Sequence, residues 1–102
     1  MAAPAETLRS ALGAGAVLVD IRKSSEREEG QVAAKAVHAE WDGASLPLDA
    51  LPSDKGAALI IHCRSGTRAA GAITFLAGAG YTNTINGGGP NTPEQWEVLT
   101  SA

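Results

Sequence analysis

The sequence of 102 residues lacks features that are typical of disulfide-bonded, membrane-spanning and secreted proteins. It contains one cysteine, which excludes an internal disulfide, and a lone thiol persists best in a reducing compartment. No apolar run approaches the roughly 20 residues that a membrane-spanning helix needs. The N-terminus lacks the basic start and the long apolar stretch of a secretory signal. We therefore expect a cytoplasmic protein that does not enter a membrane.

The net charge and the content of aromatic residues are both low. The formal net charge is −3, so we do not expect a nucleic-acid-binding surface, and any anion site must be built locally. Aromatic residues make up 4% of the chain, which leaves Ala, Val, Leu and Ile to fill the core. Such a core suits helices packed on a small sheet. The length predicts one domain over residues 1–102.

The apolar pattern predicts strands that alternate with helices. Four segments are interpreted as short strands, at residues 17–21, 36–39, 57–62 and 82–85. Helices are expected between them, at residues 4–13, 25–29, about 67–80 and from 93 onward, with one helical turn within 46–51. This alternation predicts an α/β fold, with a small, mainly parallel sheet and helices on both faces.

Several helix ends carry recognisable signals. Ser25 with Glu28, and Thr92 with Gln95, have the spacing of a capping box, in which two side chains satisfy the first backbone N–H groups. Gly80 is expected to end the third helix, with the residue after it folding back in a Schellman motif.

The only cysteine, Cys63, lies where the predicted strand 57–62 ends and a helix begins. Ligands of parallel sheets bind outside the carboxyl ends of the strands. The thiolate is the nucleophilic form of cysteine, and positive potential favours it. Arg64, Arg68 and the N-terminus of the following helix all supply such potential. The alternative is a cysteine that packs as a small apolar residue at a strand end.

The five residues after Cys63 are predicted to form an anion-binding loop. Gly66 allows the chain to curl, so that successive backbone N–H groups converge, and Ser65 and Thr67 add hydroxyl donors. Four residues separate Cys63 from Arg68, whereas five separate the cysteine and arginine of tyrosine phosphatases, which this loop resembles. The tighter ring is expected to hold a sulfur atom better than a phosphate.

Polar residues at a second strand end are candidates for a supporting role. Asp20 is expected either to accept hydrogen bonds that brace the cysteine loop or to be a plain strand end. Arg22 is expected to pair with Glu26, and in the second case this is a surface ion pair that contributes little. His62 alternates with Cys63 and should face away from it. One cysteine and two histidines give no metal signature, so no metal site is expected.

Four segments together resemble the rhodanese (thiosulfate sulfurtransferase) family. The active-site loop is the most specific, and the segments are residues 17–22, 26–32, 61–69 and 81–89, the last followed by Trp96. Gln31 stands where the family usually has His, and Lys35 where Gly is usual. Few residues precede residue 17, so the N-terminal strand common in the family has little room.

The resemblance implies a sulfurtransferase that works by double displacement. Cys63 would take the outer sulfur of a donor such as thiosulfate as a persulfide and pass it to cyanide, a thiol or a protein acceptor, without metal or organic cofactor. Two other functions remain open. One is a cysteine-dependent phosphatase or arsenate reductase, and the other is a sulfur-carrier or regulatory docking module.

Overall fold

The structure, a computed structural model, describes residues 1–101. Its single sheet contains the four strands β1 (Val17–Asp20), β2 (Val37–His38), β3 (Leu59–His62) and β4 (Thr84–Asn86). The strands lie in the order β2-β1-β3-β4, and every neighbouring pair is parallel. The α/β prediction is confirmed, and the sheet is wholly rather than mainly parallel.

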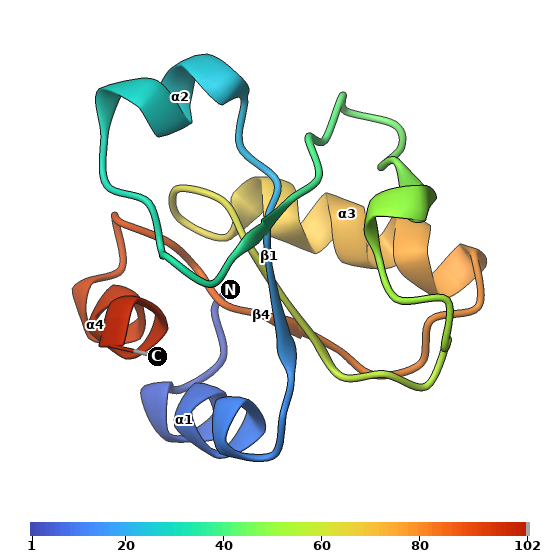
Figure 1. Ribbon diagram of the computed structural model, residues 1–102, viewed down its shortest axis with the longest axis horizontal. Coiled ribbons are helices and arrows are strands. Elements are labelled where there is room, and N and C mark those ends of the chain that lie inside the picture. Colours follow the sequence, from blue (N-terminus) through green and yellow to red (C-terminus); the bar gives the residue numbers. More distant parts are fainter. Residues whose placement is uncertain (102) are drawn as a thin grey trace.

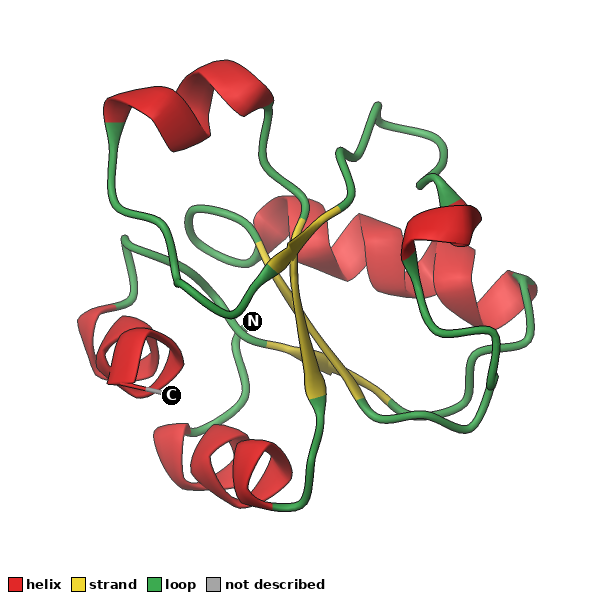
Figure 2. Ribbon diagram, in the orientation of Figure 1, coloured by secondary structure: helices red, strands yellow, loops and turns green. Residues whose placement is uncertain are grey.

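Helices cover both faces of this sheet (Figures 1 and 2). On one face lie α1 (Ala5–Gly13) and α4 (Pro93–Ser101), and on the other lie α3 (Thr67–Gly78) and the 3-10 turn η1 (Leu48–Ala50). The short helix α2 (Ser24–Glu29) follows β1 directly and lies beyond the carboxyl end of the sheet. Within residues 1–101, no helix is both long and apolar enough to cross a membrane.

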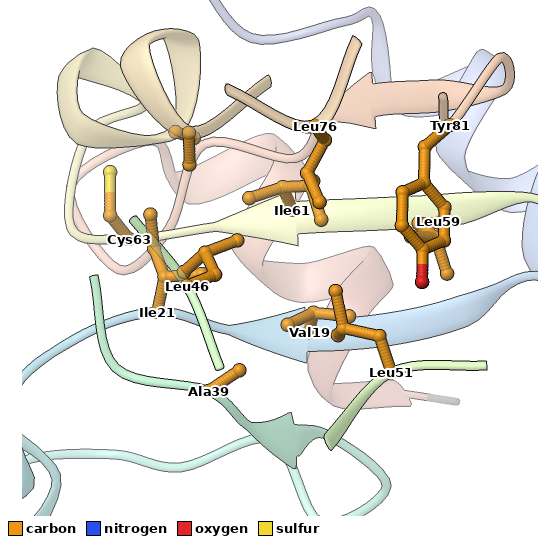
Figure 3. Packing of buried hydrophobic residues seen from close by; sticks show 12 residues of the cluster. Val19, Ile21, Ala39, Leu46, Leu51, Leu59, Ile61, Cys63, Leu76 and Tyr81 are labelled. Atoms are coloured by element: carbon orange, nitrogen blue, oxygen red, sulfur yellow. The ribbon is translucent and has the colours of Figure 1, made fainter. Parts of the chain in front are cut away.

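The side chains of the central strands are divided between two apolar cores, one on each face of the sheet. Ile61 and Cys63 face α3 and belong to the same buried cluster, which Figure 3 shows from close by. Ile60, on the opposite face of β3, packs in a second cluster with Trp96 and Leu99 of α4. This alternation follows from the two-residue period of a strand. The two central strands are therefore buried on both faces, which explains their continuous apolar runs.

The end of α3 follows its sequence signal. Gly80 has a φ of +100°, and the next residue folds back so that the Tyr81 N–H donates to the Leu76 carbonyl at 3.0 Å. The Tyr81 hydroxyl donates to the Pro52 carbonyl at 2.7 Å. The predicted Schellman ending is confirmed, and the tyrosine also holds the loop that leads to β3.

The capping box predicted at Ser25 is wrong. Helix α2 begins one residue earlier, at Ser24, and Lys23 occupies the N-cap position. The Glu26 carboxylate accepts a hydrogen bond from the Lys23 N–H at 3.2 Å. Ser25 is thus already inside the helix.

The second predicted capping box does not form either. The Thr92 hydroxyl donates to the Gly89 carbonyl at 3.0 Å and accepts from the Gly89 N–H at 3.1 Å. The Gln95 side chain donates to the Ala3 carbonyl at 3.2 Å. Both side chains of the expected box are engaged by neighbouring loops, because tertiary partners replace the local ones.

The order of the strands indicates where a ligand-binding site is expected. From β1 the chain moves outward to β2 on one side, and it then returns to β3 on the other side of β1. A parallel sheet has a natural crevice at the carboxyl ends of two strands whose connections diverge in this way. Here those strands are β1, which ends at Asp20, and β3, which is followed by Cys63.

Candidate active site

Cys63 begins a tight ring between β3 and α3. Gly66 adopts a φ of +99°, a left-handed conformation that glycine accepts without strain, and α3 begins at the next residue, Thr67. The turn directs the Gly66 N–H to the Cys63 sulfur, with a nitrogen–sulfur distance of 3.1 Å. The loop therefore curls back on its own cysteine, as the sequence predicted.

The backbone of this ring is held by the glycine-rich turn that follows β4. The Cys63 N–H donates to the Gly88 carbonyl at 2.9 Å, and the Arg64 carbonyl accepts from the Asn91 N–H at 2.8 Å. A Cβ atom on Gly89 would lie 1.9 Å from the Cys63 carbonyl oxygen, so only glycine allows this close approach. This glycine-rich turn therefore packs directly against the ring.

Asn86 fixes the apex of the ring. Its side-chain amide donates to the Gly66 carbonyl at 2.9 Å, and its side-chain oxygen accepts from the Gly88 N–H at 3.0 Å. A Cβ atom on Gly66 would lie 2.9 Å from that oxygen. Sequence analysis missed Asn86. Its position at the end of a strand beside three glycines was the available signal.

Arg68 lies at the end of the ring and faces Glu26 of α2. The two side chains form a bidentate ion pair, with nitrogen–oxygen distances of 2.7 and 2.8 Å. Arg64 has its Nε atom 4.0 Å from the same carboxylate, and its side chain is 60% exposed. Both arginines of the predicted anion site thus surround one carboxylate, which sequence analysis had assigned to Arg22.

This ion pair changes the titration of both partners. The hydrogen bonds from Arg68 lower the pKa of Glu26 from 4.5 to about 2, against a smaller opposing effect of burial. The same contact raises the pKa of Arg68. Glu26 therefore carries its charge at neutral pH. An anionic substrate that used Arg68 would have to compete with this carboxylate.

Asp20 is buried, and its hydrogen bonds go to arginines rather than to the cysteine ring. Its carboxylate accepts from the Arg22 backbone at 3.0 Å, from the Arg22 side chain at 2.9–3.2 Å, and from Arg27 at 3.1 Å. Burial alone would raise its pKa, but the contacts with Arg22 and the nearby His62 outweigh burial and lower it. Of the two alternatives for Asp20, hydrogen bonds from the cysteine loop are not formed, because these arginine donors occupy the carboxylate.

Arg22 is 2% exposed and pairs with Asp20. The pair with Glu26 that the sequence suggested does not form. Besides Asp20, its guanidinium donates to the Gln31 carbonyl at 2.8 Å and lies 5.7 Å from the centre of the Trp96 ring. The Gln31 side-chain oxygen accepts from the Trp96 indole nitrogen at 2.5 Å. Arg22 thus joins the segment after α2 to α4.

His62 connects this buried group to the ring. It faces away from the Cys63 side chain, as predicted, and packs edge-on against Trp96 with ring centres 5.3 Å apart. Its Nδ1 atom lies 3.0 Å from the Cys63 carbonyl oxygen, and its Nε2 atom lies 3.7 Å from the Asp20 carboxylate. Desolvation lowers the pKa of His62, although Asp20 opposes that effect.

The remaining predicted residues lie at the surface of the ring. Ser65 and Thr67 are exposed, with their hydroxyl oxygens 3.5 Å apart. A cavity of about 260 Å³ lies between α2 and the start of the ring, and it is lined by Arg22, Glu26, Glu29, Gly30, Gln31, Arg64 and Pro90. Residues 1–101 contain no group of three or more His, Cys, Asp or Glu side chains that could hold a metal ion.

Comparison with protein families identifies this arrangement. The family model for the rhodanese-like domain matches residues 4–89. The chain belongs to the rhodanese-like family. A search of curated proteins found no matching relative. Membership in this family indicates sulfurtransferase or related cysteine-dependent activity, which agrees with a cysteine at the start of a tight amide ring.

Proposed function

We propose that the protein is a sulfurtransferase that carries sulfane sulfur on Cys63. The observation that carries the proposal is the Gly66 N–H aimed at the Cys63 sulfur at 3.1 Å, within a ring whose next residues begin α3. Backbone N–H groups and a helix N-terminus both favour a negative charge at this position. They would stabilise the Cys63 thiolate and then the persulfide anion that replaces it.

The reaction has two displacement steps. The Cys63 thiolate attacks the outer sulfur of thiosulfate, the sulfur–sulfur bond of the donor breaks, and sulfite leaves with the electron pair. The persulfide anion formed on Cys63 is then attacked at its outer sulfur by a thiophilic acceptor, either cyanide or a thiol. This second step returns the Cys63 thiolate, so the cycle is nucleophilic covalent catalysis with ping-pong kinetics.

The surroundings of the sulfur support transfer over hydrolysis. Cys63 is 1% exposed, so a donor reaches the sulfur only when neighbouring side chains move aside. A buried persulfide would be protected from water and from stray thiols. A thiol group on a partner protein would meet the exposed edge of the ring, at Arg64 and Ser65, and such a protein is a second possible class of acceptor.

The test is the intact mass of the protein after incubation with thiosulfate. We expect a gain of about 32 Da, one sulfur atom, as covalent catalysis requires. The gain should be lost on addition of cyanide and absent in Cys63→Ala. The proposal would be wrong if neither thiosulfate nor a small-molecule persulfide produced the adduct. Hydrolysis of p-nitrophenyl phosphate without any adduct would favour a phosphatase instead.

A further inference from the structure

His62 is a buried histidine for which sulfur transfer as described above has no use. It is 0% exposed, and its ring lies on the opposite face of β3 from the Cys63 side chain. Because the Cys63 carbonyl oxygen can only accept a hydrogen bond, the Nδ1 atom 3.0 Å away must carry a proton. Burial favours the neutral ring, and in a neutral ring this contact places the proton on Nδ1.

The surroundings of the other ring nitrogen, Nε2, also indicate that Nδ1 is the nitrogen of His62 that makes a structural contact. Nε2 has no hydrogen-bond partner within residues 1–101, and its nearest charged group is the Asp20 carboxylate at 3.7 Å. Leaving a buried polar atom unpaired is destabilising. The carboxylate is already occupied by Arg22 and Arg27, so turning the ring to use it would sacrifice the contact with Cys63.

The hydrogen bond to the Cys63 carbonyl also fixes the next amide. A peptide unit is planar, and its C=O and N–H groups point in opposite directions. The Cys63 carbonyl tilts toward His62, so the N–H of Arg64 must tilt toward the face of β3 where the Cys63 sulfur lies. The backbone of Gly89 packs against the same carbonyl and leaves it little freedom to rotate.

We infer that His62 is a positioning residue, which holds the peptide between Cys63 and Arg64 so that the Arg64 N–H faces the persulfide. This inference rests on the proposed function for its chemistry. The Arg64 N–H is then the first donor of the anion-binding ring and the Gly66 N–H the second. In this proposal His62 contacts neither the sulfur donor nor the sulfur acceptor, and it acts only through the backbone of Cys63.

Two variants separate this role from simple packing. In His62→Asn, the side-chain amide nitrogen takes the place of Nδ1 and can still donate to the Cys63 carbonyl. In His62→Gln, the amide nitrogen reaches instead toward Asp20, where Nε2 lies. Gln fills the buried space better than Asn, so a packing role predicts that Gln is the milder change.

We expect the reverse order in activity. His62→Gln should lower kcat for thiosulfate turnover by about tenfold or more, since one misplaced anion-hole donor has effects of this order. Its KM should change little. His62→Asn should retain kcat within about threefold, even though we expect it to be the less stable of the two variants in urea unfolding. Equal kcat in both variants, or a kcat that follows stability, would overturn the inference.

A second measurement does not depend on sulfur transfer. In ¹⁵N-labelled wild-type protein, the ring nitrogens of His62 should show a protonated Nδ1 and an unprotonated Nε2. The Arg64 amide resonance should shift in His62→Gln more than in His62→Asn. The opposite tautomer would refute the role of His62 even if the persulfide forms. The expected tautomer and shifts without any persulfide would instead refute the proposed function.

Discussion

The ion pair between Glu26 and Arg68 gives the sharpest prediction. Replacing Glu26 by Gln removes the negative charge and leaves the Arg68 guanidinium, whose side chain is 32% exposed, without its carboxylate. Moving the pKa of Glu26 from 4.5 to about 2 corresponds to about 3 kcal/mol if it is taken whole. The pair borders solvent, where screening weakens such contacts, so we expect Glu26→Gln to lower the free energy of unfolding by about 1 kcal/mol at pH 7.

The sign of the pH dependence follows from the lowered pKa of Glu26. In the folded protein the carboxylate stays charged at a pH where the unfolded chain has already taken up a proton. The stabilisation is therefore complete above pH 4.5 and is lost as the pH falls toward about 2. Wild-type protein and Glu26→Gln should differ at pH 7 and converge near pH 2.

Urea unfolding of the single and double variants tests this reasoning. The cycle through Glu26→Gln, Arg68→Gln and the double variant should give a coupling energy of about 1 kcal/mol at pH 7. Glu28→Gln, an exposed position on the same helix, is the control and should change stability by less than about 0.5 kcal/mol. A coupling energy of zero, or one that does not change with pH, would refute the argument.

The same variant has a second expected effect, on the substrate. Because Glu26 occupies the guanidinium of Arg68, its removal should free that group for an anionic donor and lower the KM for thiosulfate severalfold. A KM that rises in Glu26→Gln would mean that the carboxylate helps to position the donor rather than competing with it.

Two further predictions concern the support of the ring. Gly89→Ala should lower the free energy of unfolding by about 2 kcal/mol or more and slow sulfur transfer, because the added Cβ meets the backbone oxygens of Cys63 and Arg64 at 1.9 and 2.7 Å. Gly78→Ala, with open space around the new Cβ, should be neutral or stabilising, and equal effects at both glycines in urea unfolding would contradict this. Burial lowers the pKa of His62 below 6.5, so stability should fall as the pH drops below 6.5. In His62→Asn this part of the fall should vanish, and an unchanged pH slope would count against it.

The sequence was sufficient to predict the elements and the ring. The run before His62 is apolar at every position, which indicated a buried strand, and Gly66 turns the chain because glycine accepts a positive φ. These features depend on residues close together in the chain. The predicted alternation of His62 and Cys63 is correct for the same reason, since the period of a strand fixes it.

The partners of the charged residues could not be predicted in this way. Arg22 and Arg68 both have acidic residues within reach once the chain is folded, and the sequence does not show which are buried together. Arg68 pairs with a residue 42 positions away, whereas Arg22 pairs with Asp20, two positions away, and also lies 5.7 Å from the centre of the ring of Trp96 in α4. The capping boxes failed for a similar reason, since Thr92 and Gln95 found partners in other segments.

The link between the ring and the glycine-rich turn also bears on the order in which the protein assembles. Cys63 and Arg64 are held by Gly88 and Asn91, which leave the ribosome more than 20 residues later. The strand before the cysteine can pair with β1 while this turn is still unmade. We therefore expect the hydrogen bonds around Cys63 to form among the last events of folding. Until the glycine-rich turn packs against the ring, Cys63 in a nascent chain would lack the contacts that hold its loop.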